Sequence, residues 1–163
     1  MGMILEFYRL SDEKIIKLKN QSEQSFAEYL EQNYASVYGK EHKENDTVFS
    51  LDKTWDVIRF LIIEADKTEH KILSGVYGEP LNGSFYNGYN FLFSENVKLI
   101  SHTLQKIHYE DLLKFYNEEK MKSQMIYNAT NFQLKFLKEE FEILKLAFEK
   151  SSQLDSALII NIG

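Results

Sequence analysis

The sequence contains no cysteine, a single proline and only seven glycines among its 163 residues. Without cysteine the chain has no disulfide bond, no thiolate nucleophile, and no zinc ribbon or finger of the kind that uses sulfur ligands. A composition of this kind suits a reducing compartment. The sequence therefore predicts a cytoplasmic protein.

Long apolar runs are also missing. The longest, Phe60 to Ile63, is far too short to cross a bilayer. Within the first ten residues, Glu6 stands where a signal peptide would need its apolar region. We therefore expect a protein that stays in the cytoplasm and does not associate with membranes.

Positive charge is in deficit, because 19 Lys and Arg face 25 Asp and Glu, which gives a formal net charge of -6 at pH 7. Such a chain repels nucleic acid unless a local basic patch overrides the net charge. The densest basic stretch, Lys14 to Lys19, directly follows Asp12 and Glu13, as is typical of a solvated helix face. We expect no nucleic acid among the partners.

What the chain has is material for one core: 44% of its residues are hydrophobic and 14% are aromatic. The length matches one ordinary domain, and no segment combines low hydrophobicity with high net charge as a disordered segment would. No internal repeat occurs. The sequence predicts a single domain over residues 1–163.

Two β-rich segments, Ile4 to Leu10 and Ala157 to Ile162, stand near the ends of the chain. Both have β-branched or aromatic residues at high density, and we expect them to pair in one small sheet. Ser11 follows the first segment as a good N-cap of a helix.

Helical spacing of apolar residues, or a clear start signal, marks six further segments. The most apolar begins at Asp52, which we expect to cap it, and the most regular begins at Phe132. The predicted fold class is α+β, a small sheet with both terminal strands covered by several helices. The helical segments are Ser22–Tyr34, Asp52–Ala65, Ser94–Ile107, Tyr109–Tyr116, Asn117–Met125 and Phe132–Lys150.

The segment from Gly75 to Phe93 concentrates glycine and aromatic residues in an irregular connection, within which Asn90 to Phe93 could form a short strand. Aromatic side chains supply large contact area at protein interfaces. One reading is that a partner binds here, through Tyr77, Tyr86, Tyr89 and Phe91. The other reading is that these rings cover the core beneath a long loop.

Catalytic patterns are absent from the sequence. No Gly-x-Gly-x-x-Gly, P-loop, Gly-x-Ser-x-Gly, zinc-protease or EF-hand pattern occurs, and we expect no cofactor and no metal. The remaining enzyme hypothesis is a small hydrolase or transferase that uses the Asp52 carboxylate, with Arg9 or Lys53 holding an anion beside it.

Several elements in a fixed order give the chain a resemblance. Met1-Gly2-Met3 begins it, Leu51-Asp52-Lys53-x-Trp55 opens the apolar helix, and Gly78-x-Pro80-Leu81 and Gly88-Tyr89 follow. Together they resemble the YfbM-like family of small bacterial proteins of unknown function. The resemblance implies a compact α+β domain and no established activity, ligand or metal. Four residues match its pattern and serve packing and capping as readily as binding: Arg9, Asp52, Lys53 and Trp55.

We predict from these observations a non-catalytic protein-binding module, for example one that neutralises a toxin, as immunity proteins do, or modulates another cytoplasmic protein. The chain is small and acidic, has no catalytic signature and is rich in aromatic residues. We expect a monomer or a weak homodimer. The alternative is the hydrolase or transferase built on Asp52.

Overall fold

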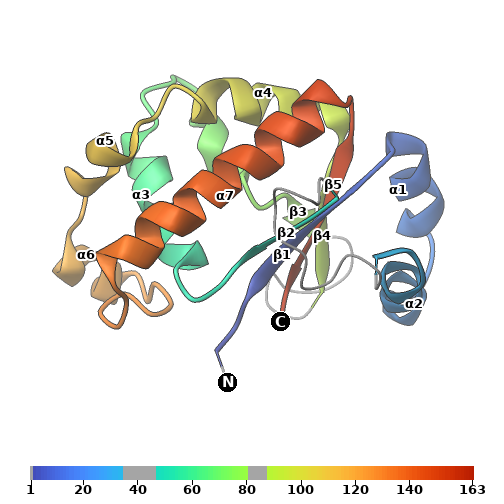
Figure 1. Cartoon of the computed structure of the whole chain (residues 1–163), viewed down its shortest axis with the longest axis horizontal. Coiled ribbons are helices and arrows are strands. Elements are labelled where there is room, and N and C mark those ends of the chain that lie inside the picture. The colour runs from blue at the N-terminus through green and yellow to red at the C-terminus, as the bar shows by residue number, and fades with distance from the viewer. Residues whose placement is uncertain (1, 35–46, 81–87) are drawn as a thin grey trace.

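The computed structural model describes residues 2–34, 47–80 and 88–163, within which five strands form one antiparallel sheet (Figure 1). The terminal strands pair at its centre, with Leu5 opposite Ile162 and Leu10 opposite Ala157, so the predicted pairing is confirmed. The strand order is β2-β1-β5-β4-β3, where the strands are β1 (Leu5–Leu10), β2 (Val48–Leu51), β3 (Glu79–Pro80), β4 (Tyr89–Leu92) and β5 (Ala157–Ile162).

Helices lie against both faces of the sheet (Figure 1). The longest, α7, crosses one face together with α3 and α4, and the opposite face carries α1 and α2. The α+β class is therefore confirmed. In the parts of the chain that the structure describes, the α-helices are α1 (Asp12–Lys19), α2 (Glu23–Tyr34), α3 (Trp55–Ala65), α4 (Ser94–Leu104), α5 (Tyr109–Leu113), α6 (Glu118–Ser123) and α7 (Leu134–Gln153).

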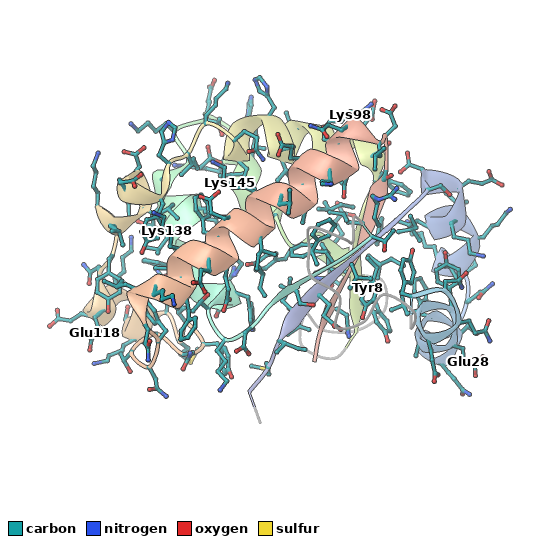
Figure 2. The ribbon with its side chains drawn as sticks, viewed as in Figure 1. Tyr8, Glu28, Lys98, Glu118, Lys138 and Lys145 are labelled. Atoms are coloured by element: carbon teal, nitrogen blue, oxygen red, sulfur yellow. The ribbon has the colours of Figure 1, made fainter. Side chains whose placement is uncertain are left out.

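The sheet separates two apolar clusters, because successive side chains of a strand point to opposite faces. Leu158 and Ile160 of β5 pack into the larger cluster with α3, α4 and α7, whereas Ala157 and Ile159 face α1 and α2. From β1, Tyr8 joins the smaller cluster, near α2 (Figure 2). Burial on both faces explains why β5 is apolar at every position except the half-buried Asn161.

The predicted helix starts at Ser11 and Asn117 are confirmed by their caps. The Ser11 side chain accepts a hydrogen bond from the Lys14 amide at 3.2 Å, and Asn117 accepts one from the Lys120 amide at 2.9 Å. Each side chain satisfies an amide that the first helical turn leaves without a partner.

The amphipathic helix predicted from Phe132 is α7. Its apolar side packs on the sheet, while Lys138 is exposed and the half-buried Lys145 donates a 3.0 Å hydrogen bond to the carbonyl of Ile107 (Figure 2). The spacing of Leu134, Leu137, Phe141 and Leu144 predicts one buried stripe, but Leu134, the first residue of the helix, is 56% exposed, so the prediction is wrong for this residue.

The segment from Gly75 to Phe93 is more regular than expected. A 3₁₀ turn ends at Gly75, and β3 and β4 follow as an antiparallel pair, which confirms a strand near Asn90. Gly78 enters β3 with a φ of +76°, and a Cβ atom added there would lie 2.5 Å from the carbonyl oxygen of Phe91. Glycine is required at this close approach.

No helix in the described ranges is long and apolar enough to cross a bilayer.

Candidate functional site

The turn between β2 and α3 carries Asp52, Lys53 and Thr54, of which the first two are exposed. The expected cap is wrong, because α3 begins at Trp55 with Thr54 at its N-cap position, and Asp52 lies two residues earlier. Thr54 makes no side-chain cap either. Its hydroxyl donates to the carboxylate of Glu140 at 2.5 Å, and its amide donates to the same oxygen at 3.3 Å.

Glu140 is the acidic residue that ties this turn to α7. Its carboxyl group is buried, with 8% of the residue exposed. Burial raises the pKa of the Glu140 carboxyl above its ordinary value; the hydrogen bonds from Thr54 act against this, and the nearby charge of Asp52 raises it further. The buried carboxyl group of this region thus has a raised pKa, while its neighbour Asp52 faces solvent.

A hollow of about 330 Å³ opens beside the turn, and we call it the Asp52 hollow. Its walls are the turn itself, the loop of residues 128–133 and the first turns of α7. The loop contributes amide and hydroxyl side chains, and Asn128 donates a 3.3 Å hydrogen bond to the carbonyl of Lys53. Phe132 and Phe136 add aromatic surface. The hollow therefore offers a carboxylate, a lysine, amides and two rings to a ligand or to a side chain of a partner.

The N-terminal segment packs behind this turn. The amide of Met3 donates to the hydroxyl of Tyr127 at 3.0 Å, and the Trp55 indole donates to the Met3 carbonyl at 3.2 Å. The rings of Trp55 and Tyr127 stack with centroids 5.7 Å apart. A Cβ atom on Gly2 would lie 2.9 Å from Cε of Lys53.

Residues of the N-terminal Met1-Gly2-Met3 element and of the Leu51-Asp52-Lys53-x-Trp55 element therefore meet in one place. Trp55 is fully buried, so its part is to anchor the N-terminal segment, whereas Asp52 and Lys53 are exposed beside the hollow. Of the matching residues in this region, Trp55 therefore serves packing, whereas Asp52 and Lys53 can contact a ligand.

Arg9 does not reach this site. It lies opposite Leu158 in the sheet, and its guanidinium donates to the Ser156 hydroxyl at 3.0 Å. Asp52 follows Leu51, which pairs with Leu5 at the other end of β1. Four residues of extended strand separate these ends by about 13 Å. The hypothesis that Arg9 holds an anion beside Asp52 is therefore wrong, and Lys53 is the cation at the site.

Of the two readings of the segment from Gly75 to Phe93, partner binding is wrong for two of the four aromatic residues, because they are buried. Tyr77 is 2% exposed and donates a 2.5 Å hydrogen bond to the Trp55 carbonyl, and Phe91 is 4% exposed. Tyr89 is half-buried and stacks on Phe26. Tyr86 lies outside the described residues. In this segment Tyr77 and Phe91 cover the core.

The helices α5 and α6 and the start of α7 lie at one end of the molecule (Figure 1), and five exposed apolar residues belong to these helices or to the loops between them. Tyr116 contacts Phe132 with ring centroids 6.1 Å apart, and Tyr109 donates to the carbonyl of Leu134 at 3.1 Å. We call this region the α5–α7 surface. Its exposed apolar residues are Leu113, Tyr116, Met125, Leu134 and Phe136.

Sequence reasoning missed both Glu140 and this surface. A signal for Glu140 was present, because it follows Leu137 by three residues and precedes Leu144 by four, which places a carboxylate on the apolar side of α7.

Across the described ranges, no three histidine or acidic side chains form a group that could hold a metal ion.

Comparison with known proteins places the chain in a family. No curated protein matches the sequence. The crystal structure of a protein of unknown function, YfbM from Escherichia coli, matches the fold with a TM-score of 0.59 at 16% sequence identity, over 98% of this chain and 99% of that one. The model of the domain of unknown function DUF1877 matches residues 1–161. The chain therefore belongs to the DUF1877 family.

Proposed function

We propose that the protein is a non-catalytic binding module that captures another protein through the α5–α7 surface and the adjoining Asp52 hollow. Toxin neutralisation and modulation of a cytoplasmic partner are both roles of this kind. The observation that supports the proposal is the concentration of exposed apolar residues, since five of the nine large exposed ones in the described part of the chain lie between Leu113 and Phe136. Such patches mark interaction sites.

The chemistry of the hollow suggests what the partner offers. The Asp52 carboxylate and the aromatic ring of Phe136 both line the hollow, and the whole chain carries a net charge of -6. An arginine pairs with a carboxylate and stacks on an aromatic ring at the same time. The partner therefore presents an arginine, surrounded by apolar side chains, from a surface that is basic overall.

Affinity purification from the source cells tests this proposal. The double variant Asp52→Lys/Phe136→Ser reverses the charge at the hollow and removes one ring from its rim. Its matched control is Ile16→Ser, which removes an apolar side chain that is 58% exposed on α1. We expect the wild type and the Ile16→Ser control each to recover one stoichiometric partner protein. The double variant is expected to lose that partner. Equal recovery with all three proteins contradicts it.

A second candidate function has one observation in its favour. The Asp52 hollow holds an exposed carboxyl group, and the pKa of the buried Glu140 carboxyl beside it is raised. An exposed carboxylate beside a buried carboxyl group of raised pKa can divide base and acid roles in a hydrolase or transferase. A screen of ester and phosphate substrates tests this function. We expect the wild-type protein to turn over at least one of them, and Asp52→Asn to abolish that turnover without loss of the fold. Turnover unaffected by Asp52→Asn excludes this site as its source.

A further inference from the structure

A second hollow, of about 380 Å³, opens at the other end of α3. The helix has 11 residues and spans about 16 Å at 1.5 Å per residue, so the two hollows are separate. The walls of the second are the loop after α3, the end of α4 and α5. We call it the Lys106 hollow.

The floor of the Lys106 hollow is apolar. Ala65 and Ile107 are 7% and 8% exposed, and Phe115 is half-buried beside them. Its volume lies in the range of small-molecule sites, which are typically about 300–1,000 Å³ and mainly apolar, with a few polar groups that fix the ligand. The floor can therefore hold a flat apolar body.

The rim of this hollow is basic, although the chain as a whole is acidic. Lys67, Lys106 and Lys114 are all exposed there. Lys114 pairs with Asp111 at 2.9 Å. Within the ranges that the structure describes, Lys67 and Lys106 take part in no ion pair. Two cations beside an apolar floor are thus not neutralised by the protein.

The remaining acidic residue of the hollow, Asp66, already has its partners. Its carboxylate accepts hydrogen bonds from the amide and hydroxyl of Thr68, at 2.9 and 2.6 Å, and from the Leu73 amide at 2.8 Å. Burial raises the pKa of Asp66, but these hydrogen bonds prevail and hold it below its ordinary value. Asp66 therefore fixes the conformation of the loop that carries Lys67. A loop held in this way is a preorganised support for a binding site.

We infer that the Lys106 hollow binds a small ligand in which an anionic group is joined to a flat apolar body, as in an aryl phosphate or an aryl carboxylate. The apolar body lies on Ile107 and Phe115. The anionic group lies at the rim, between Lys67 and Lys106. This inference does not depend on the proposed protein binding, because no residue that lines the Lys106 hollow lines the Asp52 hollow or is one of the five exposed apolar residues of the α5–α7 surface.

Titration of the full isotope-labelled chain with 1-naphthyl phosphate, followed through backbone amide NMR shifts, tests the inference. The expected shifts concentrate in residues 65–68, 103–107 and 111–115. Binding is expected to be at least tenfold tighter than for 2-naphthol, which lacks the negative charge, and than for inorganic phosphate, which lacks the apolar body. Shifts centred elsewhere, or 2-naphthol binding as tightly as the phosphate ester, overturn the inference.

Variants provide the second arm of this test. Lys67→Ala/Lys106→Ala is expected to weaken 1-naphthyl phosphate binding at least tenfold, and its amide spectrum shows whether the fold is kept. The matched control is Lys135→Ala, which removes an exposed lysine of α7 outside the hollow. An unchanged affinity in the double variant, or an equal loss in the control, overturns the proposed role of the two lysines.

Discussion

The hydroxyl of Thr54 donates a 2.5 Å hydrogen bond to the carboxylate of Glu140, which lies 86 residues further along the chain. This bond holds the turn that carries Asp52 and Lys53 against α7. The position of the exposed Asp52 carboxylate therefore depends on a buried one. A ligand or partner that binds at the Asp52 hollow therefore contacts a turn whose conformation depends on the buried Glu140 carboxylate.

Stability is predicted to depend on pH through Glu140. The pKa of its carboxyl is raised in the folded protein above the ordinary value of 4.5, so the folded state binds more protons than the unfolded state just above that pH. This group therefore contributes less stability as pH rises from about 4.5 through the raised pKa. Glu140→Gln removes the dependence, because a glutamine does not titrate.

Urea unfolding of wild type and Glu140→Gln at pH 4, 5, 6 and 7 measures this contribution. The stability of wild type relative to the variant is expected to fall across the series. The comparison cancels the opposite contributions of Asp66 and Asp111, whose pKa values are lowered. A difference that stays constant, or that moves in favour of wild type as pH rises, contradicts the assignment.

Two glycines form a matched pair for a test of backbone conformation. Gly78→Ala is expected to cost about 2 kcal/mol or more, because φ is +76° and the new Cβ would meet the Phe91 carbonyl of a neighbouring strand. Gly75→Ala, with no atom within 4 Å of the added Cβ, is expected to change the free energy of unfolding by less than about 1 kcal/mol. Equal costs at the two positions would contradict the geometry of β3.

Tyr77 is predicted to act in the core and not in partner binding. Tyr77→Phe removes the buried hydrogen bond to the Trp55 carbonyl and should cost about 1–2 kcal/mol in thermal or urea unfolding. Tyr116→Phe is the control, since Tyr116 is 40% exposed, and should change stability by less than about 0.5 kcal/mol. If both variants are as stable as wild type, the Tyr77 hydrogen bond contributes nothing.

The elements with strong local signals could be predicted from the sequence. The β5 strand has four consecutive apolar residues, Ala157 to Ile160, and Ser11 and Asn117 are good caps, so the strand and both helix starts were predicted correctly. The β2 strand was missed because its four residues are too few to show an alternation of apolar and polar side chains. The strand is stabilised by its pairing with β1. Partners distant in the sequence decide such an element.

The candidate site was predicted only in part, for the same reason. The sequence singled out Asp52 and Lys53, which lie beside a hollow, but Glu140 comes from α7 and Arg9 lies at the far end of β1. Aromatic content alone could not separate a covered ring from an exposed one. Tyr77 is buried by Trp55 and Phe7, which lie far from it in the sequence.

Calorimetric titration of the purified partner against wild type, Ile16→Ser and Asp52→Lys/Phe136→Ser tests the proposed binding function most directly. We expect the same affinity for wild type and Ile16→Ser. For the double variant we expect at least a hundredfold loss of affinity, about 2.7 kcal/mol of binding free energy, with an unchanged unfolding midpoint. Equal affinity of all three proteins for the partner, or failure of the wild-type chain to bind any stoichiometric partner, would contradict it.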